Sequence, residues 1–172
     1  MITPLIVAFL GYAFLAVVAI MDKFILTKSV KKTATLTFYS TIFFLLLFLF
    51  LPWVDKLDST LDYIVSLVSG LAFGFALWAM FISLKEGEAS HISPFVGGVT
   101  AVATYVFSYL ILSENLSREV VFGFAFLTLA CFLLSFEKSR RHKGFHRGFI
   151  WAVLAGVLFG LSHVTAKMIY DL

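Results

Sequence analysis

The sequence predicts an all-α fold, a polytopic bundle of transmembrane helices, and two observations lead to this class. Hydrophobic residues make up 61% of the 172 residues and charged residues only 13%, whereas soluble domains are about one quarter charged. The 21 phenylalanines lie in apolar runs without alternation, and the mean hydropathy is +1.01. An open sheet edge cannot face lipid, so the elements within these runs are predicted to be helices.

Each of about six apolar runs is near the ~20 residues that a helix needs to cross the hydrocarbon core. Basic residues fall mainly in the first, third and fifth connections, so the positive-inside rule places the amino terminus outside and the fifth connection, Glu137–Arg147, in the cytoplasm. The first run lacks a basic segment before it and is interpreted as a retained helix rather than a signal peptide. The expected spans are roughly Pro4–Met21, Ala34–Val54, Tyr63–Leu84, Ile92–Leu112, Val120–Phe136 and Gly148–Ile169.

The first and last spans carry a repeated segment. Ile6–Leu26 and Ile150–Tyr170 align with identical residues that include Lys23 and Lys167. Five predicted helices separate the starts of the two copies. Because this number is odd, the copies are predicted to run in opposite directions through the membrane. Such an inverted repeat is typical of secondary transporters, whose substrate path lies at the interface between repeats.

Polar side chains follow one face of the fourth span. Thr100, Thr104 and Ser108 recur every four residues, and Tyr105 and Tyr109 flank them. On a helix this spacing makes a single polar stripe with an aromatic edge. The stripe either lines a substrate path or consists of hydroxyls that bond back to carbonyls one turn earlier and only pack.

Two further residues are candidates for the same path. Trp78 follows Gly74 by about one turn, and it either lines a cavity or belongs to the aromatic belt at the membrane interface. His163 is the only histidine within a span. Its imidazole suits proton handling, and the alternative is a structural role or a polar position in a cavity.

Glycine and proline positions indicate how the helices pack or break. Gly70-x-x-x-Gly74 in the third span and Gly156-x-x-x-Gly160 in the sixth permit close helix approach, either within the chain or in a dimer.

The fourth span begins near Pro94, which is followed by Gly97 and Gly98. One interpretation is that Ser93 caps this helix and Pro94 occupies its first turn. The other is an unwound segment that exposes backbone groups to substrate.

The sequence predicts no enzyme, cofactor or metal site. Its four histidines lack metal-ligand spacing, and no Ser/His/Asp set or phosphate loop is present. Cys131 is the only cysteine, which excludes a disulfide framework within the chain. Glu86, Glu88 and Glu114 are expected at the membrane interface, which argues against a proton-coupled mechanism based on a central carboxylate. The excess of basic residues is attributed to membrane topology rather than to nucleic-acid binding.

The segment Ser83–Phe95 reads SLKEGEASHISPF, and Leu110–Ser117 reads LILSENLS. With these motifs, and with Asp22-Lys23 after the first span, the chain resembles the EamA-type transporters of the drug/metabolite transporter superfamily. Phe38-Tyr39-Ser40 departs from the family pattern, because many members carry an arginine where the second helix begins. The matching positions are Ala89, Ser90, Pro94, Glu114, Leu116 and Ser117, with Ser113 where the family often has glycine.

The resemblance implies a domain organisation. Residues 1–137 would form a first five-helix repeat, 138–147 a basic linker, and 148–172 the first helix of a second, incomplete repeat. The rest of that repeat is expected in cis, with the sequence being a fragment of a ten-helix protein, or from a homo- or hetero-oligomeric partner. Ten-helix members have both termini in the cytoplasm, which disagrees with the charge distribution.

The resemblance also implies a function. We expect a secondary transporter of small organic metabolites in the plasma membrane, which works by alternating access between two inverted repeats. The alternatives are a flippase for lipid-linked intermediates and a non-transporting membrane scaffold or assembly subunit.

Overall fold

The computed structural model describes residues 2–30, 32–46, 49, 59–113, 117–135 and 145–170. All regular structure in these ranges is helical, and five of the helices are long and apolar enough to cross a membrane. The prediction of an all-α, multi-span protein is therefore confirmed. The helices are α1 (Ile2–Lys28), α2 (Thr33–Ile42), α3 (Thr60–Glu86), α4 (Ala89–Ile111), α5 (Arg118–Ser135) and α6 (Phe145–Tyr170).

The first two helices differ from the predicted spans. α1 continues to Lys28, whereas the predicted first span ends at Met21. In this extension Leu26 is buried in the core, and the ammonium group of Lys23 donates to the carbonyl of Leu84 on α3 and to that of Gly87, the residue after α3. The apolar run of α2, with its 3₁₀ continuation, reaches Leu46. Most of the remaining predicted span, up to position 54, lies outside the described residues.

α3 and α4 are joined by a tight turn. The Gly87 amide donates to the Ser83 carbonyl, and the amides of His91 and Ile92 donate to the Glu88 carbonyl. Glu88 therefore occupies the N-cap position, and α4 begins at Ala89.

Both interpretations of the start of the fourth span are wrong. Glu88 rather than Ser93 occupies the N-cap position, and the segment around Pro94, Gly97 and Gly98 is helical rather than unwound. Pro94 lies inside a helix that is continuous past Gly97 and Gly98, because the turn at Gly87 starts α4 before the proline is reached. The missing proline N–H removes only one backbone bond from the ladder.

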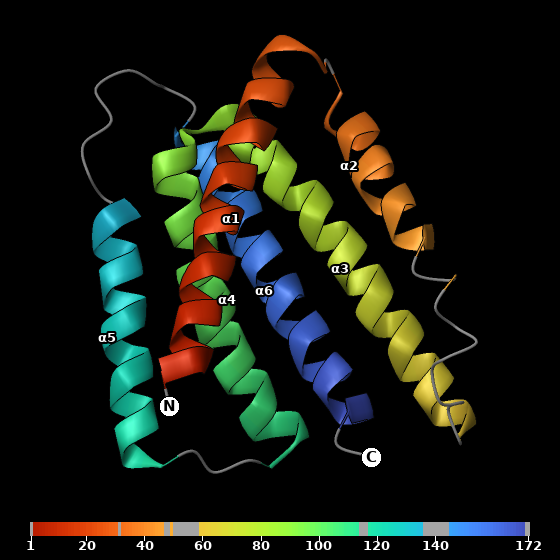
Figure 1. Ribbon diagram of the computed structural model, residues 1–172, viewed down its shortest axis with the longest axis vertical. Coiled ribbons are helices and arrows are strands. Elements are labelled where there is room, and N and C mark those ends of the chain that lie inside the picture. Colours follow the sequence, from red (N-terminus) through yellow and green to blue (C-terminus); the bar gives the residue numbers. More distant parts are fainter. Residues whose placement is uncertain are drawn as a thin grey trace.

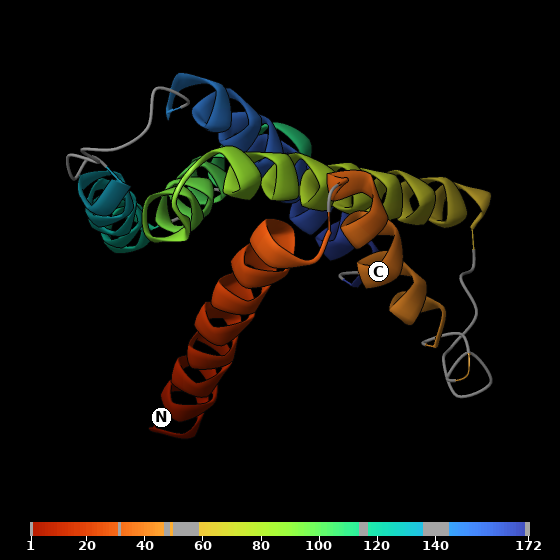
Figure 2. The same ribbon diagram turned by 90° about the horizontal axis from the view of Figure 1, so that it is seen from above.

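The two copies of the repeated segment run in opposite directions, as the odd helix count predicts. Figure 1 shows α1 rising from the N-terminus and α6 descending to the C-terminus. Seen from above, α1 projects away from the group formed by α3, α4, α5 and α6 (Figure 2). Most of its side chains from Ile6 to Met21 are exposed.

Serine hydrogen bonds fix the packing of α6 on α3 at two levels. The Ser83 hydroxyl donates to the Gly148 carbonyl at 2.7 Å, and the Ser69 hydroxyl donates to the Ser162 carbonyl at 2.9 Å. Ser69 and Ser83 are two heptads apart on α3, and their acceptors on α6 have the same spacing. Both hydrogen bonds therefore lie on one face of an antiparallel helix pair. Between these levels the contact face is made of small buried residues. These are Ala72, Ala76 and Ala79 on α3 and Ala152 and Ala155 on α6.

α6 also packs closely on α4 through its glycine pair. A Cβ added at Gly156 would lie 2.6 Å from the Cβ of Val99, and one added at Gly160 would lie 2.6 Å from the Cβ of Ala103. In lipid, helices associate through van der Waals contact and interhelical hydrogen bonds, and small residues allow that contact. The glycine pair of α6 is therefore a packing motif within the chain.

We predict that Gly160→Ala destabilises the protein by about 1–3 kcal/mol, because the added methyl overpacks the contact with Ala103 and the backbone amide of Thr104. The matched control is Gly74→Ala, where an added Cβ meets nothing within 4 Å. Both substitutions bring the same change in helix propensity, so the difference isolates the clash. Thermal unfolding in detergent measures it, and equal midpoints for the two variants would contradict this packing.

Candidate functional site

A groove runs between α2 and α3. Its central part has a volume of about 460 Å³, and its floor contains Gly70 and Gly74. An added Cβ at either glycine would meet nothing within 4 Å, so these glycines make no close helix contact here. The sequence predicts close helix approach at both glycine pairs, either within the chain or in a dimer. Among the described residues the pair on α6 makes such a contact, and an approach at Gly70 and Gly74 in a dimer stays a prediction. The lining of the central part is Ala34, Thr37, Phe38, Thr41, Gly70, Leu71, Gly74, Phe75 and Trp78.

The groove continues into a charged end of about 480 Å³. The two parts share Ala34 and Trp78, and together they are called the α2–α3 groove here. One oxygen of the Glu86 carboxylate, Oε2, is buried and has no hydrogen-bond partner among the described residues. The lining of the charged end is Lys32, Thr33, Ala34, Trp78, Ile82, Lys85 and Glu86.

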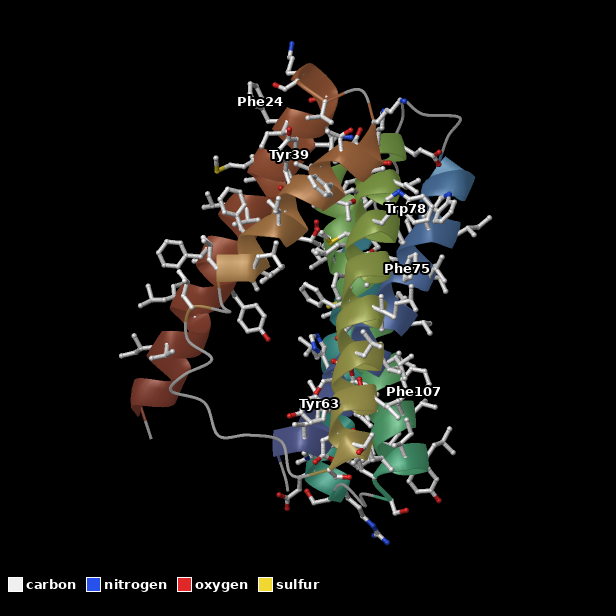
Figure 3. All side chains as sticks on the ribbon, turned by 90° about the vertical axis from the view of Figure 1, so that its right-hand side faces the viewer. Phe24, Tyr39, Tyr63, Phe75, Trp78 and Phe107 are labelled. Carbon is white, nitrogen blue, oxygen red and sulfur yellow. The ribbon has the colours of Figure 1, made fainter. Side chains whose placement is uncertain are left out.

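The side chains in the central part of the groove present an apolar and aromatic surface. The Thr37 hydroxyl donates to the Thr33 carbonyl at 3.2 Å and the Thr41 hydroxyl to the Thr37 carbonyl at 2.8 Å, so both protons are used within α2. Phe75 and Trp78 project from the same side of α3 (Figure 3). The Trp78 ring packs edge-on against Trp151 of α6, with centroids 5.9 Å apart, which fixes one wall of the groove.

The polar stripe of α4 lies partly against α6 rather than along this groove. The Thr100 hydroxyl donates to the Val96 carbonyl at 2.8 Å, and Ser108 is buried. A Cβ on Gly160 would lie 2.9 Å from the backbone nitrogen of Thr104. Tyr109 is exposed. These contacts include the back-bonding that the packing interpretation describes, and the proposed role in a substrate path stays a prediction.

Tyr105 belongs to a different cavity, about 360 Å³ in volume, between α4 and α5. Val102, Phe124, Thr128 and Phe132 are among its other lining residues. Tyr105 and Trp78 therefore lie in separate cavities. The nearby Gly98 approaches α5, where an added Cβ would lie 3.1 Å from that of Cys131, whereas Gly97 faces open space.

His163 stands at the end of an aromatic row. Its ring stacks near Phe159, with centroids 6.4 Å apart, and Phe159 packs edge-on against Phe73 of α3 at 5.5 Å. Phe73 in turn contacts Phe44, in the 3₁₀ continuation of α2, at 5.7 Å. The row links α6 through α3 to the end of α2. His163 itself is exposed in this chain.

Lys23 attaches α1 to the end of α3. Its ammonium group donates to the carbonyls of Leu84 and Gly87, each at 2.6 Å. The last carbonyls of a helix have no partner within the helix and carry the negative end of its dipole, so an ammonium group is a suitable cap. The sequence places Lys23 in the repeated segment and in the family motif Asp22-Lys23, and neither pattern predicts these two acceptors.

The described residues therefore form a polytopic membrane protein with a lateral groove and no group of three or more His, Cys, Asp or Glu side chains that could hold a metal ion. Residues 2–136 match the EamA-like transporter family, and the chain belongs to that family. No curated protein and no solved structure matches the chain significantly. Members of the family are transporters rather than enzymes, so the chain is a membrane protein of the drug/metabolite transporter superfamily.

We predict that Lys23→Met destabilises the attachment of α1 by about 1–3 kcal/mol, because two carbonyls at the end of α3 lose their donor. Faster hydrogen exchange at the end of α3, together with a lower unfolding midpoint in detergent, measures the loss. Lys28→Met on the exposed end of α1 is the matched control. Unchanged exchange in Lys23→Met would contradict the capping role.

Proposed function

We propose that the chain is a secondary transporter of small organic metabolites that works by alternating access between two inverted five-helix halves. The observation that carries this proposal is the opposite direction of α1 and α6, two copies of one segment. α6, the first helix of the second half, packs on α3 and α4 of the first half. By the symmetry of an inverted repeat, α1 would pack on the corresponding helices of the second half.

The exposed length of α1 fits this exchange of first helices. Its side chains are largely exposed from Ile6 to Met21, while Leu26 near its end is buried in the core. The second half would come from further residues in cis or from a homo- or hetero-oligomeric partner, and the setting would be the plasma membrane. Rocking of the halves would open a path lined partly by Thr104 and Tyr105 of α4, with His163 as a polar contact on α6.

A second candidate function is supported by the α2–α3 groove. A flippase for lipid-linked intermediates needs a lateral site beside the helix bundle, and Phe38 and Phe75 of the groove are 60% and 56% exposed. A non-transporting scaffold is the third alternative.

Proteoliposomes loaded with a panel of organic solutes distinguish solute transport from these alternatives. If the chain transports solutes, Thr104→Ala and Tyr105→Ala are expected to slow solute counterflow. Absent counterflow would contradict solute transport and leave the flippase and the scaffold. Counterflow that is unaffected by both substitutions would contradict the path along α4.

Alternating access predicts that one position on the path reacts from both sides of the membrane. Cys131 is the only cysteine, so Cys131→Ala gives a cysteine-free background. In this background, Thr104→Cys is expected to react with a membrane-impermeant maleimide from either face of sealed vesicles. Ser135→Cys, at a fully buried position, is the control and is expected to stay unlabelled. Labelling of Thr104→Cys from only one face, or from neither, would contradict alternating access.

A further inference from the structure

We propose that the α2–α3 groove binds an amine-bearing phospholipid of the bilayer, with its headgroup at Lys32, Lys85 and Glu86 and its chain along Gly70 and Gly74. The proposed lipid site is the same whatever solute the protein transports. Lipid binding to it is measured directly, without a transport assay.

The order of chemistry along the groove matches a lipid in a leaflet. At 1.5 Å per residue, the stretch of α3 from Gly70 to Glu86 is about 24 Å long. The charged residues of this stretch, Lys85 and Glu86, lie at the end of the predicted membrane span, at the interface. Its glycines and aromatic residues lie within the apolar part of the span. A phospholipid already has its headgroup at the interface and its chains in the hydrocarbon core, so it would enter this groove without leaving the bilayer.

The apolar part of the groove has room for a chain. An added Cβ at Gly70 or Gly74 meets nothing within 4 Å, in contrast to Gly156 and Gly160 on α6. The missing side chains of α3 therefore leave open space beside α2 rather than a helix contact. Phe75 is exposed beside this space and can cover a hydrocarbon chain.

The charged end has an acceptor that lacks a donor. Oε2 of Glu86 is buried and unpaired among the described residues, and a buried unpaired polar atom is costly. An ammonium group supplies a charge-assisted hydrogen bond of the kind that a carboxylate accepts strongly. Glu86 also lines the charged end of the groove, so its carboxylate borders the space that the ammonium group would occupy.

The lysines of the same end supply the complementary charge for a phosphate. Lys32 and Lys85 both line the cavity that Glu86 lines. A headgroup that combines a phosphate with a primary amine therefore matches both signs of charge. Phosphatidylethanolamine has this combination. Phosphatidylcholine carries the same charges but has no N–H to donate, and phosphatidylglycerol has no amine.

Native mass spectrometry of the full chain in detergent tests the proposal, with these three lipids as probes. We expect phosphatidylethanolamine to bind about tenfold more tightly than phosphatidylcholine, since the N–H donor distinguishes them. Glu86→Gln is expected to remove most of this preference, and it leaves the shape of the groove unchanged. Gly74→Leu is expected to weaken binding of both lipids by filling the groove, whereas Gly123→Leu, another open glycine on α5, is expected to weaken neither.

Several results would overturn the proposal. Equal binding of the three lipids, or a preference for phosphatidylglycerol, would leave only a non-selective basic surface. If Glu86→Gln kept the preference for phosphatidylethanolamine over phosphatidylcholine, Glu86 would not be the contact of the amine. If Gly74→Leu folded and bound both lipids normally, the lipid chain would not lie along Gly74. Displacement of the lipid by equimolar soluble phosphoethanolamine would show a site for a free headgroup compound instead. Because Glu86→Gln alters no packing volume, it decides the amine contact even if Gly74→Leu fails to fold.

Discussion

The close approach of α6 to α3 and α4 is the contact on which the rest of the structure depends. In a bilayer the hydrophobic effect does not drive helices together, so association requires small residues and interhelical hydrogen bonds. α6 supplies both: Gly156 and Gly160 bring it against α4, and the Gly148 carbonyl accepts from Ser83 on α3. Ser69 and Ser162 repeat the polar contact at the other end of the α3–α6 pair. The register of the helix pair is thereby fixed at two levels.

This arrangement determines what is left for the other helices. The small-residue face of α3 is used by α6, so α2 meets a different face, on which Gly70 and Gly74 leave a groove. α1 is held mainly near its end, where Leu26 enters the core and Lys23 caps α3. Glu86 stands where these contacts meet, because α6 passes close to it at Gly148. The groove and its unpaired carboxylate oxygen therefore follow from the position of α6.

The sequence predicted the helices and their alternation because long apolar runs have few other solutions in lipid. The odd number of predicted helices between the starts of the two copies was enough to predict that α1 and α6 run in opposite directions. It could not separate Gly70-x-x-x-Gly74 from Gly156-x-x-x-Gly160, since spacing does not specify which helix lies opposite. The role of Lys23 was also out of reach, because its acceptor Leu84 is 61 residues away and the acceptor at Gly87 depends on a turn. The unpaired oxygen of Glu86 likewise arises only in the assembled bundle.

The central place of α6 also bears on how the protein is made. α3 and α4 are adjacent in sequence and joined by a tight turn, yet each contacts α6 far more extensively than it contacts the other. Chains emerge from the ribosome in sequence order. The helices from α1 to α5 are therefore synthesised before α6, and until then Ser69 and Ser83 lack their hydrogen-bond partners on α6. The contacts of α3 and α4 with α6 can form only once α6 has been synthesised and has inserted beside them.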